Sequence, residues 1–431
     1  MKVAADQSAR KDFEGSDLIV AEEQTVSYGN PTLRFTHRTA RVTVVLTDYT
    51  EERMFVRLTG LSTENGNPAQ ITPYNKGGDT YTALVAPQSV ATGTAFITCK
   101  FTNGKVFVYK MKNDTDWQAG KEYTYTVSLA AAKDPGYTVS EDGKTYTVTS
   151  ADGLLAWNEA VQKDMTLNCT LADNIDLTGK DWTPIGTSFG NSYTGTFDGN
   201  GKTITGLTVT GSDRYTGLFG FIKGTVKNVV LTEINITSGT FVGGVAGWSF
   251  GGNIENCSVS GSVSGSDVGG VVGYQQGGSI TGCSSSATVK GTQRAGGVAG
   301  TTNSGATLTA CYATGDVTVK NDGTSNAWAG GVVGSNAYST VIACYAAGNV
   351  SGTGSGTIHV GGVTGENFDG TLTACYWSGL PDNDNGGATK VDGTTVTWQT
   401  AVAAMNAALS GKGWQYELKD GNSLPTLKKE Q

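Results

Sequence analysis

Aromatic side chains are the residues of this sequence whose spacing best fits a ligand-binding role. A tyrosine directly follows each of three regularly spaced cysteines, and further rings follow a repeated glycine-rich phrase. If the cysteines point inward, the tyrosines point outward and form a ladder. The candidate ligand-binding residues are Tyr312, Tyr345, Tyr376, Trp377, Trp248 and Tyr274. Such a row suits sugar rings, which stack on flat faces; the alternative is a structural ladder that only stabilises the strands.

Amide side chains accompany these rings and could hydrogen-bond to sugar hydroxyls. They are Gln275, Gln276, Asn303, Asn336 and Asn367. The aromatic residues Phe250, Tyr338 and Phe368 also lie in the stretches after the glycine-rich phrase. Rings interleaved with amides suit a glycan as ligand, but a structural ladder is the favoured interpretation of the aromatic residues.

Acidic residues are scattered rather than clustered, which argues against catalysis. A polysaccharide-degrading enzyme of this class needs paired carboxylates on one face, with basic residues beside them. The acids between residues 240 and 376 are Glu255, Asp267, Asp316, Asp322, Glu366 and Asp369. Apart from the neighbours Glu366 and Asp369, they do not share a repeat position, and no GxSxG, HExxH, P-loop or CxxC motif occurs. We expect no enzyme and no cofactor, with a polysaccharide lyase or hydrolase as the alternative.

Two further features could be read as sites. Asp382 and Asp384 alternate with asparagines before Gly386, as in a calcium loop, but the remaining ligands of an EF-hand are missing. A polar turn is the favoured interpretation of this weak metal candidate. His37, one of two histidines, lies among strand residues and is expected to be a hydrogen-bonded structural histidine.

The composition restricts the class of protein and of partner. The 431 residues include 62 glycines and 8 prolines, which favours many short strands and turns. The net charge of −8 without a basic cluster argues against nucleic acid or an anionic membrane as partner. No apolar run is long enough for a transmembrane helix. The start of the chain lacks the apolar region of a signal peptide, so the protein is either cytoplasmic or has lost its leader.

A repeat organises residues 215–377 and predicts a right-handed parallel β-helix. Glycine doublets recur roughly every 26 to 34 residues, a period typical of solenoids. Their leading glycines are Gly243, Gly269, Gly296, Gly330 and Gly361. We expect them at tight corners, where a positive φ or a close backbone approach excludes a Cβ. A cysteine column keeps the same period: Cys257, Cys283, Cys311, Cys344 and Cys375. Buried free thiols are favoured over disulfides, because Val229 occupies the same position in the first coil.

The remaining segments complete an all-β protein with short helical caps. Short alternating strands predict a β-sandwich over residues 16–132, after a flexible segment at 1–15 and before a linker at 133–136. The β-helix is expected over 137–393, with an N-terminal cap and first coils at 137–214. Ser150 is placed to cap a helix there. Residues 394–431, with a helical pattern after Trp398, are expected to cap the open end of the array.

The sandwich segment resembles the fimbrillin-like surface proteins of Bacteroidetes. The resemblance rests on SDLIVA at 16–21, FTHRTARVTV at 35–44 and WQAGKEYTYTV at 117–127. It implies an exported protein at the cell surface or outer membrane, lipid-anchored through a leader absent from this chain, with other fimbrial subunits as partners. That family usually has two sandwiches, and only one is found here, so assembly into a pilus shaft is not carried over.

The solenoid resembles GLUG-repeat surface proteins. The phrases NIDL at 174–177, WTPIG at 182–186, GTFDGNGKTI at 195–204 and GLFG at 217–220 carry this resemblance. It implies the β-helix and a role in cell adhesion more than it implies a ligand. We therefore predict an adhesin or fimbria-associated protein that presents its β-helix to a host or dietary glycan or to a surface protein. A purely structural stalk is the remaining alternative.

Overall fold

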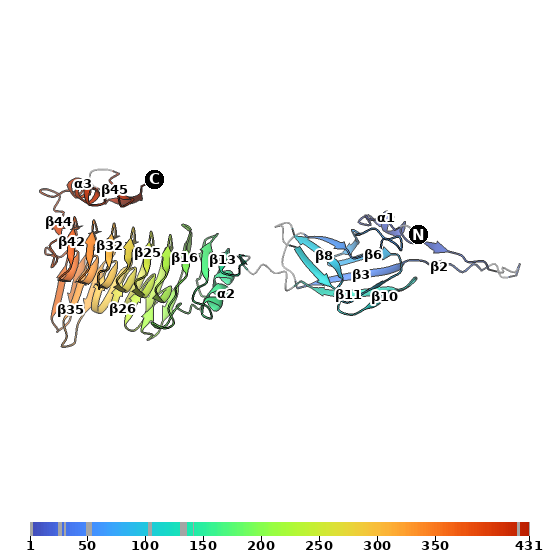
Figure 1. Cartoon of the computed structure of the whole chain (residues 1–431), viewed down its shortest axis with the longest axis horizontal. Coiled ribbons are helices and arrows are strands. Elements are labelled where there is room, and N and C mark those ends of the chain that lie inside the picture. The colour runs from blue at the N-terminus through green and yellow to red at the C-terminus, as the bar shows by residue number, and fades with distance from the viewer. Residues whose placement is uncertain are drawn as a thin grey trace. The chain divides into compact units, whose positions relative to one another are not determined.

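The computed structural model describes residues 3–24, 28–29, 32–48, 54–101, 106–129, 136–140, 142–419 and 423–430. It divides into two compact units, Met1–Asp134 and Pro135–Gln431 (Figure 1). The predicted all-β fold, a β-sandwich followed by a parallel β-helix with short helices, is confirmed. Residues 133–135 of the predicted linker lie outside the described residues. No helix in the described ranges has the length and apolarity to cross a membrane.

The first unit is a β-sandwich of two main sheets around one core. One sheet has the order β11-β3-β6-β5, in which β11 and β3 are parallel, and the other has the order β4-β8-β9. Their strands are β3 (Ala40–Thr47), β4 (Met54–Leu58), β5 (Tyr74–Gly77), β6 (Thr80–Val85), β8 (Ala95–Phe101), β9 (Val106–Lys110) and β11 (Glu122–Ser128). Two ribbons flank them: β1 (Ile19–Val20) with β2 (Thr36–His37), and β7 (Gln88–Val90) with β10 (Thr115–Trp117). Alternate residues such as Val42, Val44 and Phe96 fill the core.

The N-terminal segment is part of this sandwich, so the prediction of a flexible stretch at 1–15 is wrong for its described residues. Val3 is only 4% exposed and belongs to the core. The Gln7 side chain receives the Leu84 N–H and donates to the Leu84 carbonyl, both at 2.9 Å. Helix α1 (Arg10–Glu14) places Phe13 in a stack on Tyr74. A segment that satisfies a buried strand in this way is held by the fold.

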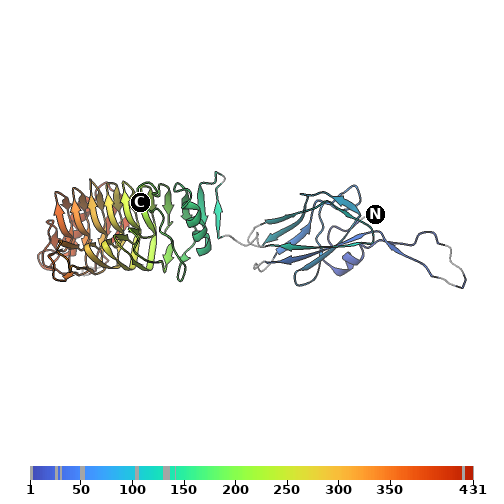
Figure 2. The same ribbon diagram turned by 90° about the horizontal axis from the view of Figure 1, so that it is seen from below.

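The second unit is a parallel β-helix of three sheets (Figures 1 and 2). Within these three sheets, the pairs between described strands are parallel apart from β12–β13. The first sheet contains β12 (Tyr137–Val139), β13 (Thr145–Val148), β14 (Asn168–Leu171), β16 (Thr196–Asp198), β21 (Thr225–Lys227), β25 (Asn253–Glu255), β28 (Ser279–Thr281), β32 (Thr307–Thr309), β37 (Thr340–Ile342) and β42 (Thr371–Thr373). The second contains β20 (Phe219–Ile222), β24 (Ala246–Phe250), β27 (Val272–Gln276), β31 (Ala299–Asn303), β36 (Val333–Ala337) and β41 (Thr364–Phe368).

The third sheet carries the stretch between the cysteine column and the glycine doublet of each coil. It contains β15 (Ile175–Asp176), β17 (Thr203–Thr205), β18 (Thr208–Thr210), β19 (Tyr215–Thr216), β22 (Val230–Thr237), β23 (Phe241–Gly243), β26 (Ser258–Gly269), β29 (Ser284–Ser285), β30 (Thr288–Gly296), β33 (Tyr312–Ala313), β34 (Val317–Lys320), β35 (Ala327–Gly330), β38 (Tyr345–Ala346), β39 (Val350–Thr353), β40 (Ile358–Gly361), β43 (Tyr376–Trp377) and β44 (Thr389–Lys390). Each coil thus passes from the first sheet to the third and then to the second.

The repeat positions pair in register, as the sequence predicts. Along the first sheet, Ile254, Ile280 and Leu308 are partners of one another in successive strands. The five cysteines that follow these strands are buried and free, as are the other two cysteines of the chain. Cys311 donates its backbone N–H to Cys344 Sγ at 3.4 Å. The column therefore packs as a ladder of thiols, and burial raises the pKa of Cys375 to about 12.

The glycine doublets form the corner between the third and second sheets through close backbone approach. None of the five leading glycines has a left-handed φ, so that part of the expectation is wrong. A Cβ added at Gly330 would lie 2.0 Å from the Val333 carbonyl oxygen. Left-handed backbone occurs instead directly before the cysteine column, at Asn256, Ala310 and Ala343 among others. The corner before the third sheet therefore carries the conformational strain.

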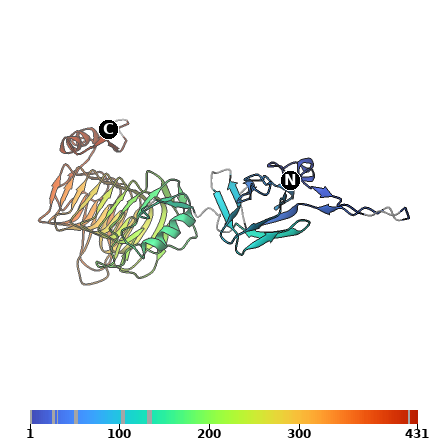
Figure 3. The same ribbon diagram turned by 45° about the vertical axis from the view of Figure 1, so that its right-hand side comes forward.

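The two ends of the β-helix differ in what covers them. Helix α2 (Ala151–Val161) has its N-terminus capped by Ser150, as predicted, and buries Trp157 against Phe197 of the first coils. At the other end, the predicted cap over 394–431 does not cover the open coil. Helix α3 (Trp398–Ala408) and the hairpin β45 (Trp414–Glu417) and β46 (Thr426–Lys429) lie along the flank of the helix (Figure 3). Lys429 reaches back to Glu255, 2.7 Å away.

Candidate functional site

The tyrosine column forms as predicted but is covered by the C-terminal segment. Tyr312 and Tyr345 stack with 5.0 Å between ring centroids and an interplanar angle of 3°. Tyr345 is 1% exposed, and its hydroxyl donates to the Pro425 carbonyl at 2.5 Å. The rings of Trp398 and Tyr416 meet its edge. Burial raises the pKa of Tyr345. The prediction that Tyr345 binds a ligand is therefore wrong, because the C-terminal segment, with α3, β45 and β46, occupies the face of its ring.

The other two members of this predicted group also serve the fold. Tyr376 is half-buried and packs at the edge of the same cluster. Trp377 is 5% exposed and lies on the inward column, where its Nε1 donates to the Pro381 carbonyl at 2.9 Å. It lies against Gly362, where an added Cβ would come within 2.2 Å of the indole. Trp377 is thus a core residue of the last coil and not a surface ring.

The acidic turn after the last coil caps backbone groups. The Asp384 carboxylate accepts N–H groups from Val363 and Thr364 at 2.7 Å each. It also accepts those of Gly386 and Ala388. Asp382 pairs with Lys390. Within the described part of the chain, no cluster of three or more His, Cys, Asp or Glu could hold a metal ion. Asp384 therefore closes the end of the coil, where unpaired N–H groups would otherwise remain.

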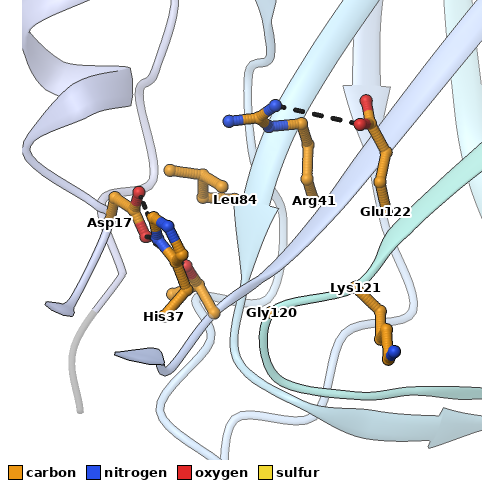
Figure 4. Close-up of a pocket in the computed structure, with 8 residues that line it drawn as sticks. Asp17, His37, Arg41, Leu84, Gly120, Lys121 and Glu122 are labelled. Carbon is orange, nitrogen blue, oxygen red and sulfur yellow. Dashed lines mark hydrogen bonds and ion pairs between the residues drawn. The ribbon is translucent and has the colours of Figure 1, made fainter. Parts of the chain in front are cut away.

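A small pocket in the sandwich surrounds His37 (Figure 4). It has a volume of about 150 Å³ and is also lined by Asp17, Arg41 and Glu122. His37 Nδ1 lies 2.9 Å from the Asp17 carboxylate, which also accepts the Thr39 hydroxyl at 3.0 Å. The contacts are those of the hydrogen-bonded structural histidine that the sequence predicts.

A second cluster of rings lies outside the core of the β-helix, at the doublet corner of the first regular coils, where Phe221 and Phe241 are 2% and 9% exposed and Tyr215, Trp248 and Tyr274 are half-buried. Tyr215 and Phe241 begin strands β19 and β23 of the third sheet, whereas Phe221, Trp248 and Tyr274 occupy equivalent positions in strands of the second. Trp248 contacts Phe241 at 4.7 Å and Tyr274 at 4.4 Å between ring centroids. We call these five residues the aromatic face. None of them belongs to the buried core cluster of the β-helix, so they lie on its outer side.

The aromatic face extends at its border into more exposed rings. Phe189 is 58% exposed and meets Phe221 and Phe250 edge-on. Trp248 and Tyr274 are half-buried, which leaves part of each ring accessible to solvent. Of the predicted ligand-binding residues, only these two lie together on an open surface. Tyr215, Phe221 and Phe241 were missed, although a ring on both sides of the glycine phrase was visible in the sequence.

The same two columns become polar in later coils. After Phe241, the third-sheet column continues with Asp267, Arg294, Trp328 and His359. Arg294 pairs with the buried Asp267 at 3.2 Å, and its guanidinium lies 5.2 Å from the Trp328 ring centre. Burial raises the pKa of Asp267, and Arg294 opposes this effect. The second-sheet column continues with Thr301, Ser335 and Glu366.

The predicted amides divide between the two sides of the second sheet. Gln275 and Asn336 are buried inside the helix, so the expectation that they bind a sugar is wrong. Asn336 accepts the Thr302 hydroxyl at 2.7 Å and donates to Asn367 Oδ1 at 2.7 Å. An internal polar ladder of this kind satisfies side chains that face the core. Gln276 and Asn303 remain half-exposed on the outer side.

Two regions of the chain match known family models. Residues 1–152 match the fimbrillin-like family. Residues 238–264 and 264–290 each match the GLUG motif. These matches confirm both resemblances that the sequence suggested. Halomucin from Haloquadratum walsbyi (strain DSM 16790 / HBSQ001) is 36% identical over 108 residues, which is 22% of this chain and 1% of halomucin. The chain thus spans about one hundredth of the length of that relative.

One solved structure shares the fold at low sequence identity. A candidate immunoglobulin A1 protease from Bacteroides ovatus is similar over 67% of this chain and 93% of its own, with a TM-score of 0.52 and 20% identity. A structure named IgA1 protease gives a TM-score of 0.45 over 79% of this chain and 28% of its own, at 18% identity. A fimbrial protein from Bacteroides ovatus gives 0.20 over 33% of each chain, also at 18%. The chain therefore joins a fimbrillin-like domain to a β-helix that carries GLUG motifs.

Proposed function

We propose that this protein is a non-catalytic cell-surface adhesin or fimbria-associated protein that binds glycans on the aromatic face of its β-helix. The fimbrillin-like domain at residues 1–152 supports a surface or fimbrial protein. The GLUG motifs fall on residues 238–290, which include Phe241, Trp248 and Tyr274 of the aromatic face. The proposed binding surface therefore lies in the part of the β-helix that carries these motifs.

One observation carries the glycan assignment. The rings of Tyr215, Trp248 and Tyr274 pack around the buried ring of Phe241 at the doublet corner and keep part of their own surface accessible. Sugar rings present flat apolar C–H faces that pack on aromatic rings, and their hydroxyl groups bond to polar neighbours. The Asn303 amide, which donates to the Tyr274 hydroxyl at 3.1 Å, is such a neighbour. Because the rings lie on paired strands, they are held in place before a ligand arrives.

The arrangement of carboxylates favours binding over hydrolysis. Asp267 and Glu366 line the two outer columns, but they are three coils apart. Since adjacent strands are about 4.8 Å apart, their separation along the axis is about 14 Å. Glycosidase carboxylates are about 5–9.5 Å apart. Asp267 is also 4% exposed and bound to Arg294. A polysaccharide-degrading enzyme is therefore the weaker candidate.

A structural stalk is the second candidate function, and the covered tyrosine column favours it. If all rings served only to hold strands and the cap in place, the protein would bind no sugar. A glycan-array screen of the purified chain, run with and without calcium, separates the two functions. Selective binding that does not depend on calcium is expected. An array without any bound glycan would contradict the adhesin proposal and support the stalk or a protein ligand.

A further inference from the structure

Two cationic side chains flank the aromatic face. The Arg214 guanidinium carbon lies 5.4 Å from the ring centre of Tyr215 and 5.8 Å from that of Phe241. At the opposite border, Lys223 Nζ lies 3.5 Å from the ring centre of Phe189. It also donates to the Phe189 carbonyl at 2.9 Å. The two charges therefore lie at either side of the rings and are oriented by them.

These cations are not neutralised by acids in the part of the chain that the structure describes. On the same columns, Arg294 forms an ion pair with Asp267 at 3.2 Å, and Glu366 accepts the Ser335 hydroxyl at 2.5 Å. Arg214 and Lys223 form no ion pair among the described residues. The chain as a whole carries a net charge of −8. Two cations that form no ion pair with a described residue, beside partly accessible rings on an acidic protein, indicate a site for an anion.

We propose that the aromatic face binds an acidic glycan, with a sugar ring on Trp248 and Tyr274 and its carboxylates at Arg214 and Lys223. This inference rests on the proposed glycan-binding function and specifies the class of ligand. The guanidinium of Arg214 can bind a carboxylate through two parallel N–H bonds, and the ammonium of Lys223 acts as a point charge. A neutral sugar would leave both charges without a partner at the interface.

A charge-matched pair of ligands tests the inference. The array first identifies the bound glycan among uronate-containing, sialylated and neutral sugars. The best acidic ligand and its methyl ester, which keeps the rings and loses the charges, are then titrated by calorimetry. We expect the ester to bind at least tenfold more weakly. We also expect binding of the acid to weaken strongly between 50 and 500 mM salt. Equal binding of acid and ester, or a preference for neutral glycans, would overturn this inference and leave the proposed function intact.

A matched double variant assigns the effect to the two cations. R214Q/K223Q should reduce affinity for the acidic ligand at least tenfold and flatten its salt dependence. K290Q/K320Q removes the same charge from a different surface of the third sheet and should change affinity less than twofold. If the two variants lose affinity equally, the effect is one of net charge and the assignment is wrong. If the array shows no bound glycan at all, the proposed function fails together with this inference.

Discussion

Two aromatic regions of the same β-helix differ in whether another part of the chain covers them. In the tyrosine column, Tyr312 of β33 and Tyr345 of β38 stack with near-parallel rings, and the column is covered by α3, β45 and β46. The aromatic face at the doublet corner mixes stacked ring pairs with edge-on ones, and its rings Tyr215, Trp248 and Tyr274 stay partly accessible. The regular ladder is thus a docking surface for the chain's own C-terminus. Regular spacing of rings indicates only that they occupy equivalent positions in successive coils. Whether such rings can bind a ligand depends on whether another segment of the chain covers them.

The largest expected effect is a loss of folding stability when the tyrosine column beneath α3, β45 and β46 is cut back. Tyr345→Ala should lower the free energy of unfolding by about 3–5 kcal/mol, because it removes a fully buried ring and its bond to the Pro425 carbonyl. Chemical denaturation measures this loss. Tyr376→Ala, at the half-buried edge of the same cluster, is the control and should cost less. Equal losses in the two variants would show that the cap does not hold the column as described.

The second largest loss of stability is expected at the acidic turn of Asp382 and Asp384. Asp384→Ala removes the acceptor of two 2.7 Å bonds from the last coil and should cost about 2–3 kcal/mol. Hydrogen exchange should speed up first at Val363 and Thr364, since their N–H groups lose the carboxylate. Calcium should leave the Tm of the native chain unchanged. A rise of Tm with calcium that disappears in Asp384→Ala would mean that the turn is a metal site after all.

Removing a ring from the aromatic face should lower the free energy of unfolding less than removing Tyr345. Trp248→Ala removes a half-buried ring and should cost no more than about 1.5 kcal/mol, below the range for buried aromatic residues. The same denaturation experiment as for Tyr345 measures it. A loss as large as that of Tyr345→Ala would show that Trp248 is mainly structural. The contrast between the covered and open regions would then disappear.

The smallest effect is a pH dependence at the polar end of the outer columns. Burial raises the pKa of Asp267, so its carboxyl favours the fold while protonated. That contribution is present below the unfolded pKa, near 3.9, and is lost as the pH rises through the folded pKa. Asp267→Asn stays neutral, so its stability relative to the native chain should improve from pH 3 to pH 7. A decline over this interval would show that the pair with Arg294 outweighs burial.

Local periodicity was sufficient to predict the coils. The aliphatic column of Ile254, the cysteine column and the helix capped by Ser150 all follow from residues that repeat or cap within a short stretch. Adjacent coils repeat the same backbone path, so a position in the sequence repeat becomes a position in space. The β-sandwich was predicted in the same way from alternating strands, although the burial of Val3 and Gln7 was not.

Long-range docking could not be predicted. The helical pattern around Met405 and the tyrosines of the column are both visible, but nothing in the sequence pairs Tyr416 with Ala343, whose carbonyl accepts its hydroxyl at 3.0 Å. The sequence allowed only part of the aromatic face to be predicted, namely Trp248 and Tyr274. Phe241 and Trp248 lie seven residues apart on either side of a glycine doublet, and only the sharp corner brings their rings together. A search for rings on both sides of each doublet would have found the pair.

The most direct test of the account compares one residue from each aromatic region. The glycan selected on the array is titrated against Trp248→Ala and Tyr376→Ala by calorimetry, after each variant is shown to be folded. We predict at least a tenfold loss of affinity, about 1.4 kcal/mol, for Trp248→Ala and less than twofold for Tyr376→Ala. A loss confined to Tyr376→Ala, or unchanged binding in both variants, would contradict the assignment of the binding site to the aromatic face.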